Sequence, residues 1–294
     1  MALPASCGQQ AGLQVREEHV SFRNGDVTLE GTLLLPHADR PCPGVVLVHG
    51  SGDETRDGYR VFANSFAARG IATLIYDKRG VSASSGSWRS GDFTELAEDA
   101  RAGLQFLSSR KGVDPQRAGL WGVSEGGWVV ARAAASYAAV RFVVGISAAG
   151  MSPACQERYR RGLLADQATQ LGALRALRKG ATLGVFGTLR LPPMCLLPGL
   201  AGYFARTMDC DPLPWWEAID CPILLVYGEA DATVPARESA ARIVDARLAR
   251  ERAAPTVYLY PGADHAIRVR DSHTGTWSFA PTYLDDVATW IASR

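Results

Sequence analysis

The sequence predicts an α/β fold with a mainly parallel central sheet, helices on both faces and a helical insertion. Short apolar runs typical of buried strands alternate with longer amphipathic segments typical of helices. Several of the apolar runs end in glycine-rich or acidic turns, and the alternation stops over residues 151–216. Parallel strands joined through helices are connected by right-handed crossovers, which places helices on both faces of the sheet.

Composition bounds the size and the partners of the protein. A chain of 294 residues accommodates one large α/β domain with an insertion, or two small domains. The net charge of +1 gives no reason to expect nucleic acid or an anionic membrane surface as a partner. No uninterrupted apolar run reaches the roughly 18 residues of a membrane helix, so we expect no integral membrane segment. We expect a small-molecule partner and leave the oligomeric state open.

The cysteines and the N-terminus bear on metal binding and location. Six cysteines are scattered without the paired spacing or the neighbouring histidines of a zinc site, so we expect no metal. Their even number permits disulfides without requiring them. Residues 1–12 lack the charged start and apolar core of a secretory signal, which favours the cytoplasm. Residues 3–7 are similar to the end of a cleaved leader, so export is the alternative.

The first half of the chain predicts a hairpin followed by parallel strands. Two partly alternating segments meet at Asn24-Gly25, a strong two-residue turn sequence, and form an antiparallel start to the sheet. Continuous apolar runs then suit strands that are buried on both faces. The predicted strands cover residues 14–23, 27–35, 44–48, 71–76, 118–121 and 142–146. The predicted helices cover residues 59–69, 93–109 and 128–137.

The second half contains an insertion before the alternation resumes. Residues 151–216 hold helical stretches and proline-rich breaks without a clear strand. Because this region falls between two strands, it is expected over the carboxyl ends of the sheet, where open α/β sheets bind ligands. We therefore predict a core domain of residues 1–150 and 217–294, with a helical cap at 151–216. The later elements are expected at 222–227 and 256–260 as strands, and at 236–248 and 281–293 as helices.

The stretch Gly122–Gly127 is predicted to be a nucleophile elbow, a tight turn from strand to helix that exposes a strained serine. Glycines lie two residues to either side of Ser124, after the apolar run 118–121 and before the helical segment 128–137. The glycines are needed because the turn brings strand and helix backbones too close together for side chains. The alternative is an ordinary glycine turn in which Ser124 only caps the helix.

Two later loops supply an acid and a base for this serine. Asp231 follows the apolar run 223–227 and His265 follows the run 257–260, so both lie past the carboxyl ends of predicted strands. A serine hydroxyl is hardly ionised at neutral pH, so an imidazole must take its proton, and a carboxylate then orients the imidazole. Alternatives for the acid are Asp264 and Glu229, and alternatives for the base are His273, His19 and His37.

The turn His49–Gly52 is predicted to supply an oxyanion hole. It follows a buried strand, and a glycine-rich turn there can aim a backbone N–H at the carbonyl oxygen of a substrate. Ser51 is the first candidate donor and Gly52 the second, with the backbone N–H of Glu125, next to the serine nucleophile, as the partner. His49 is expected to brace the loop. The alternative is an ordinary glycine turn.

With these motifs the chain resembles the α/β-hydrolase superfamily over nearly its whole length, including the chain order of serine, acid and histidine. More narrowly, it is similar to bacterial serine esterases of the branch that includes serine-aminopeptidase-like and bile-acid acyltransferase-like hydrolases. The residues that carry this likeness are His49–Gly52 with Arg56-Asp57, Tyr76–Gly80, Gly122–Trp128, Gly228–Asp231 and Gly262–His265.

The resemblance implies an α/β-hydrolase fold and a supporting role for two arginines. Arg56 and Arg79 would brace loops near the site rather than perform chemistry. In similar proteins Asp77–Gly80 is usually followed by Val-Gly-x-Ser, whereas this chain has Val81–Ser84 with the sequence Val-Ser-Ala-Ser. This departure leaves the shape of that loop open.

Apolar residues of the insertion predict a pocket above the serine. They would form an acyl or aromatic pocket, or else the core of the insertion itself. The basic residues Arg158, Arg160 and Arg161 could bind an anionic substrate, or could lie on a solvated helix face. The residues expected to contact substrate are Gly52, Trp128, Leu197, Tyr203 and Trp215.

These candidates predict a serine hydrolase that cleaves small or short-acyl carboxylic esters through an acyl-enzyme, without a metal or organic cofactor. An aminopeptidase, amidase or thioesterase would use the same triad. A peptidase acting on free N-termini would need a carboxylate for the amine, for which Glu125, Asp53 and Glu54 are candidates. The alternative from another class is a non-catalytic ligand-binding protein, which we would expect to lack a member of the triad.

Overall fold

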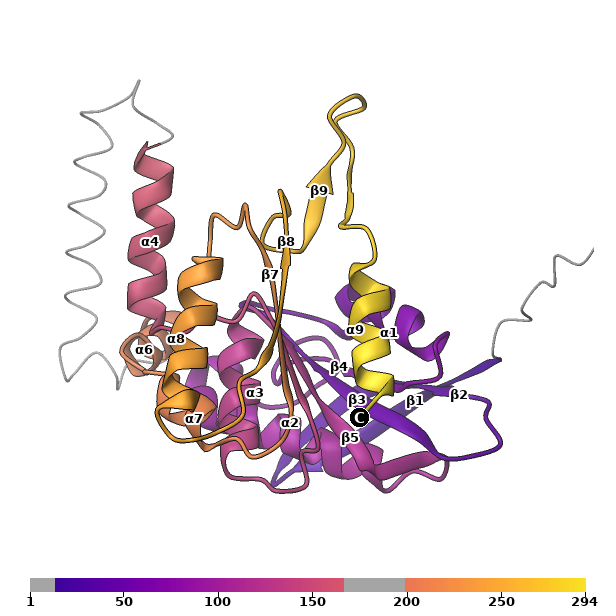
Figure 1. Ribbon diagram of the computed structural model, residues 1–294. Coiled ribbons are helices and arrows are strands. Elements are labelled where there is room, and N and C mark those ends of the chain that lie inside the picture. Colours follow the sequence, from indigo (N-terminus) through magenta and orange to yellow (C-terminus); the bar gives the residue numbers. More distant parts are fainter. Residues whose placement is uncertain (1–13, 167–198) are drawn as a thin grey trace, which may run out of the picture.

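The computed structural model describes residues 14–166 and 199–294, and over these it shows an eight-stranded sheet with helices on both faces (Figure 1). The sheet order is β1-β2-β4-β3-β5-β6-β7-β8. β1 pairs antiparallel with β2 and β2 with β4, whereas every other pair in this sheet is parallel. The predicted sheet and hairpin are confirmed. The strands are β1 (Val15–Asn24), β2 (Val27–Pro36), β3 (Cys42–Val48), β4 (Ala72–Tyr76), β5 (Val113–Val123), β6 (Val143–Ile146), β7 (Ile223–Gly228) and β8 (Thr256–Tyr260).

Among the described residues, five helices cover the sheet in two layers. They are α1 (Arg60–Ala67), α2 (Phe93–Ser108), α3 (Glu125–Ala135), α8 (Ala236–Leu248) and α9 (Tyr283–Ala292). Successive side chains of a strand point to opposite faces, so Val46 and Val48 of β3 join one apolar cluster while Val45 and Leu47 join another. The first cluster packs against α2, α3 and α8, and the second against α1 and α9 (Figure 1). Burial of strands on both faces explains their continuous apolar sequences.

Three features differ from the sequence predictions by more than one or two residues at an element end. β5 begins at Val113, five residues before the start expected at residue 118, so it includes Asp114-Pro115. Its pairing with β3 is irregular there and becomes regular from Ala118 onward, because a proline cannot donate to the ladder. α3 begins directly after Ser124 rather than at Trp128. A short hairpin of β9 (Arg268–Arg270) and β10 (Trp277–Phe279) lies between β8 and α9 and was not predicted.

Helices occupy the described part of the chain between β6 and β7. They are α4 (Pro153–Asp166), α6 (Gly199–Thr207) and α7 (Leu213–Ala218), and they gather with α8 at one side of the molecule (Figure 1). Tyr203 and Trp216 belong to the same apolar cluster as α2 and α3, so these helices pack directly onto the core. Buried Arg247 of α8 donates hydrogen bonds to the carbonyl oxygens of Trp216 (2.7 Å) and Ile219 (2.9 Å), which attaches α7 to α8.

Candidate active site

Ser124 occupies a strained turn between β5 and α3. Its backbone has a φ of +55° and a ψ of −115°, a combination that residues with side chains rarely adopt. A Cβ atom at Gly122 would lie 2.3 Å from the carbonyl oxygen of Gly126, and one at Gly126 would lie 2.6 Å from that of Val48. Both glycines are therefore required by the close approach of β3, β5 and α3, which is the backbone geometry of a nucleophile elbow.

Asp231 and His265 form a hydrogen-bonded pair in the loops after β7 and β8. Asp231 Oδ2 lies 2.7 Å from His265 Nδ1, and the Asp231 side chain is fully buried. The other carboxylate oxygen, Oδ1, accepts hydrogen bonds from the backbone N–H groups of Thr233 (2.7 Å) and Val234 (2.9 Å). With Nδ1 donating to Asp231, Nε2 of the neutral imidazole is free to accept a proton.

The alternative acids and bases lie elsewhere. Asp264 pairs with Arg268 and Glu229 pairs with Arg237, so neither contacts the imidazole. The other candidate histidines lie in the turn between β9 and β10 or at the N-terminal hairpin; they are His273, His19 and His37. Asp231 is thus the acid that the fold places against His265.

The loop after β3 presents an unoccupied backbone donor. Gly50 is held on both sides: its N–H donates to the Tyr59 hydroxyl at 2.7 Å, and its carbonyl oxygen accepts from Lys78 Nζ at 3.0 Å. The backbone N–H groups of Ser51 and Glu125 have no acceptor among the described residues. Both residues line the same cavity as Ser124. The two N–H groups expected to form the oxyanion hole are therefore available.

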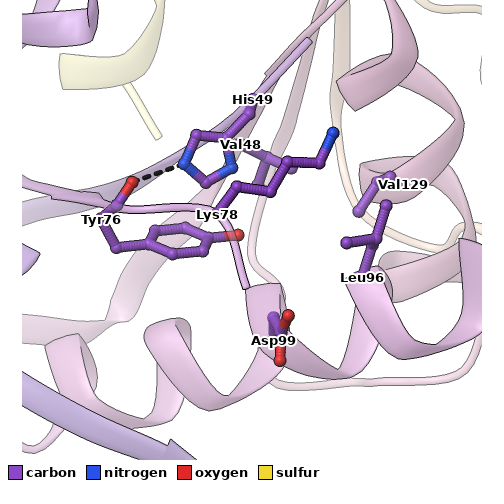
Figure 2. Close-up of a pocket in the computed structure, with 7 residues that line it drawn as sticks. All are labelled: Val48, His49, Tyr76, Lys78, Leu96, Asp99 and Val129. Carbon is purple, nitrogen blue, oxygen red and sulfur yellow. Dashed lines mark hydrogen bonds between the residues drawn. The ribbon is translucent and has the colours of Figure 1, made fainter. Parts of the chain in front are cut away.

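His49 braces this loop from below. Its Nε2 lies 2.5 Å from the carbonyl oxygen of Tyr76 (Figure 2). Its ring also packs edge-to-face against the rings of Tyr76 and Tyr59. Burial lowers the pKa of His49 to about 3, so the ring is neutral at physiological pH. The space around it, about 10 Å³, is too small for an organic ligand. This geometry agrees with the structural role expected for His49.

A buried ion pair lies directly beside the elbow. Lys78 Nζ lies 2.6 Å from Glu125 Oε1, and the two residues are 2% and 4% exposed. The ammonium group also lies 4.7 Å from the centre of the Trp88 ring. Sequence reasoning placed both residues in site motifs but did not pair them. The only available signal was that the loops after β4 and β5 meet at one edge of the sheet.

The other charged residues of these loops have structural partners, as the resemblance implied. Arg79 makes two hydrogen bonds of 2.6 Å to the carboxylate of Asp99. Arg56 donates its backbone N–H to Asp77 Oδ1 at 2.9 Å, and its guanidinium lies 3.8 Å from the same oxygen. Both arginines therefore brace loops near the elbow.

A cavity of about 330 Å³ opens above Ser124. Its walls come from α2, α3 and the helices between β6 and β7, and they combine aromatic with charged side chains. The lining residues are Ser51, Phe93, Ser124, Glu125, Trp128, Pro153, Gln156, Glu157, Arg160, Arg161, Tyr203, Phe204, Thr207 and Met208. The Ser124 hydroxyl makes no hydrogen bond to the described side chains, so its contact with His265 stays a prediction.

The expected substrate contacts divide into three groups. Trp128 and Tyr203 line the cavity, and their contact with substrate stays a prediction. Gly52 and Trp215 are not among the lining residues; the Trp215 ring instead packs against the guanidinium of Arg132, 5.2 Å from the ring centre. Leu197 lies outside the described residues. Arg160 and Arg161, which also line the cavity, both pair with Glu157.

Three carboxylates were candidates for binding the amine of a peptide substrate, and their surroundings differ. Glu125 is paired with Lys78. Asp53 accepts hydrogen bonds from Trp88 Nε1 at 2.7 Å and from Arg89, and these bonds lower its pKa. Partial burial raises the pKa of Glu54. Of these three carboxylates, Glu125 and Asp53 are therefore already bound to other side chains.

The described part of the chain shows neither a metal-binding cluster nor a membrane-spanning helix. Over residues 14–166 and 199–294, no group of three or more His, Cys, Asp and Glu side chains is placed to hold a metal ion. Within these ranges, no helix is both long and apolar enough to cross a bilayer. Cys42, Cys155, Cys210 and Cys221 are free thiols.

A family comparison agrees with this geometry. Residues 45–274, most of the chain, match the model of the Alpha/beta hydrolase family. The chain belongs to this family. The match does not distinguish the narrower branch that the sequence resembles, so that branch stays a prediction.

The chain is also similar to individual proteins, in part of the sequence or in the fold. The quorum-quenching protein AidA of Acinetobacter baumannii is 34% identical over 118 residues, which cover 40% of this chain and 39% of AidA. The esterase EstD of Thermotoga maritima is 29% identical over 233 residues, which cover 74% of this chain and 54% of EstD. The chain thus matches about half or less of these curated relatives. The Pyrococcus furiosus esterase Pf2001 shares the fold, with a TM-score of 0.61 and 15% identity over 99% of this chain and 94% of that one.

Proposed function

We propose that this α/β-hydrolase family member is a serine carboxylesterase that acts through an acyl-enzyme. The observation that carries the proposal is the hydrogen bond between Asp231 and His265 at the sheet edge where Ser124 occupies its strained turn. A carboxylate, an imidazole and a serine at one edge are the components of nucleophilic acyl transfer. The similarity to the esterase EstD supports the same reaction class.

In the proposed first half-reaction, Ser124 Oγ attacks the carbonyl carbon of the ester while His265 Nε2 takes the hydroxyl proton. The negative charge that develops on the carbonyl oxygen is accepted by the backbone N–H groups of Ser51 and Glu125. The tetrahedral intermediate then collapses, the ester C–O bond breaks, and His265 returns the proton to the leaving alcohol. Asp231 stabilises the imidazolium and keeps its ring in the required orientation.

In the second half-reaction, water attacks the acyl-enzyme. His265 takes a proton from the water, the same two N–H groups hold the oxyanion, and Ser124 leaves with the proton that His265 returns. The products are the carboxylic acid and the free enzyme. Each bond made or broken uses groups present at this edge, so the cycle requires no cofactor.

The cavity supports a small acyl or alcohol group as the substrate portion above Ser124. A volume of about 330 Å³ lies at the lower end of the range for small-molecule sites. Side chains of α4 and α6 form part of its wall, and we propose that residues 151–216 act as a cap over the site. Of the charged groups at the wall, Glu157 pairs with both Arg160 and Arg161, and Glu125 pairs with Lys78, which lies outside the wall.

Aminopeptidase activity is the less favoured use of the same triad. An enzyme that binds a free amino terminus needs an unpaired carboxylate close to the nucleophile, and Glu125 and Asp53 are both committed to cations. A thioester differs from an ester only in the leaving group, so a thioesterase remains within the proposed class. Paired assays on an ester, a thioester and an aminoacyl amide with the same acyl chain length would rank these leaving groups.

Replacement of Ser124 by alanine tests the proposal. We expect kcat on p-nitrophenyl butyrate to fall by at least about 1,000-fold, because the nucleophile is lost while the oxyanion donors remain. Labelling by a fluorophosphonate should also disappear. Ser109→Ala, an exposed serine at the end of α2, is the matched control and should keep both. Full turnover by a folded Ser124→Ala variant would disprove the proposal.

A further inference from the structure

Lys78 connects the two loops that carry the proposed oxyanion donors. Its ammonium group donates a hydrogen bond of 3.0 Å to the carbonyl oxygen of Gly50 and forms an ion pair of 2.6 Å with Glu125 Oε1. Gly50 precedes the first donor, Ser51, and Glu125 is itself the second donor. Lys78 does not line the cavity, so it cannot act on substrate directly.

The bond to Gly50 determines where the Ser51 N–H points. The carbonyl of Gly50 and the N–H of Ser51 belong to one peptide group, which is planar and trans, so the two point in opposite directions. The ammonium that holds the carbonyl oxygen on one side therefore directs the N–H to the other side. Tyr59 holds the preceding peptide group through the N–H of Gly50. A hydrogen bond to the carbonyl also polarises the N–H of the same peptide.

The ion pair with Glu125 acts on the second donor. Glu125 is the first residue of α3, and its carboxylate is buried close to the place where the oxyanion forms. A lone buried carboxylate there would repel the developing negative charge, because Coulomb interactions are strong in a weakly polar interior. The ammonium of Lys78 balances that charge. It also fixes the side chain whose backbone N–H must face the oxyanion.

From these contacts we propose that Lys78 is a positioning residue of the oxyanion hole, which orients the Ser51 N–H and neutralises Glu125 without touching the substrate. The inference rests on the proposed function, since it assigns a role within that reaction. A purely structural ion pair is the competing explanation. Arg79 and Asp99 provide a control for this explanation. They form a buried ion pair of 2.6 Å, and Arg79 follows Lys78 in the sequence, but neither residue contacts Ser51 or Glu125.

The test replaces both partners of each pair. Replacing Lys78 alone would leave Glu125 as an uncompensated buried charge and could unfold the protein. The test variant is therefore Lys78→Met with Glu125→Gln, and the matched control is Arg79→Met with Asp99→Asn. Each is assayed for kcat and KM on p-nitrophenyl butyrate, for the inhibition constant of an alkyl trifluoromethyl ketone, and for thermal stability. The ketone forms an oxyanion adduct with the serine, so its affinity reports the oxyanion hole.

We expect kcat of the Lys78/Glu125 variant to fall by about 10- to 100-fold while KM changes by less than about threefold, because misdirecting a donor costs less than removing it. The inhibition constant of the ketone should rise by a similar factor. The Arg79/Asp99 control should lose thermal stability and keep its kcat. Glu125→Gln alone, which leaves Lys78 on Gly50, should reduce kcat by only about three- to tenfold.

Two results would overturn the inference. One is a folded Lys78/Glu125 variant with unchanged kcat and ketone affinity, and the other is a control variant that loses kcat to the same extent. If the double variant does not fold, Lys78→Arg, which keeps a positive charge beside Glu125 but places it on a wider planar group, decides by the same two readouts. Ser124→Ala is run in parallel: its inactivity together with an unaffected Lys78/Glu125 variant rejects the role of Lys78 and leaves the esterase proposal standing.

Discussion

The carboxyl edge of the sheet and the helices between β6 and β7 both face the cavity, but they are built differently. At the sheet edge, backbone geometry places the reacting groups: a strained Ser124, a peptide N–H at Ser51, and Asp231 held by two backbone N–H groups. The described helices contribute side chains, among them Tyr203 and Phe204 of α6. We propose from this difference that the sheet edge carries the chemistry and the helices set the substrate preference.

This contrast has a physical origin. Groups tied to neighbouring backbones cannot shift without breaking several hydrogen bonds, and catalysis depends on positions held within fractions of an ångström. Side chains that line an apolar wall contribute contact area, which changes affinity gradually. Substitutions at the sheet edge should therefore affect all esters alike, whereas substitutions in the helices should affect some esters more than others.

The largest effect is expected for Asp231→Asn at the sheet edge. The amide can hold the imidazole only in the wrong tautomer, so kcat should fall by about 1,000- to 10,000-fold. Acetyl, butyryl and hexanoyl esters of p-nitrophenol should lose activity by the same factor. Asp264→Asn, which removes a carboxylate paired with Arg268, is the control and should change kcat by less than about threefold. Losses that differ between acyl lengths would break the proposed division between the two regions.

A smaller, ester-dependent effect is expected for Phe204→Ala in α6. Loss of the ring should lower kcat/KM by about 5- to 20-fold for the longer acyl groups that reach it, because a buried aromatic contact contributes about 1–2 kcal/mol. The acetyl ester should change little. Leu200→Ala lies on the same helix but is 48% exposed, and it should leave every ester unaffected. A uniform loss across acyl lengths would contradict the role of this helix in selectivity.

The smallest effect concerns stability at low pH and involves His49, which braces the loop after β3. Burial lowers the folded-state pKa of His49 to about 3 from 6.5, so the unfolded chain takes up a proton first as the pH falls. This residue should therefore remove up to about 1.4 kcal/mol of stability per pH unit between roughly pH 6.5 and 3. Urea unfolding of wild type and His49→Gln at pH 7 and pH 4.5 measures the contribution.

The glutamine variant can still donate to the Tyr76 carbonyl but cannot take up a proton, so its stability should fall less steeply with acidification. Equal slopes for the two proteins would show that His49 is not buried as a neutral ring. Esterase activity at pH 7 should be affected less than stability, because His49 supports the loop and does not contact the substrate.

Much of the fold and the reacting edge could be predicted from the sequence because local features encode them. Gly122 and Gly126 indicate backbones in close contact, and continuous apolar runs indicate strands covered on both sides. Other features depend on packing. Asp114-Pro115 fall inside β5 because Val113 pairs with Cys42 ahead of the regular ladder that begins at Ala118. Sequence alone left Asp231, Asp264 and Glu229 as rival acids, and only the placement of the loop after β8 separates them.

By itself the sequence determined the alternation of strands and helices along the chain and the tight turn at Ser124, since short-range requirements of that turn leave few alternatives to glycine. The tertiary structure alone decided which side chains meet. Lys78 and Glu125 are 47 residues apart, and their pairing depends on how two strands bring their loops together. Trp215, expected at the substrate, packs against Arg132 instead. Contacts between distant segments arise from packing of whole elements, which no local pattern records.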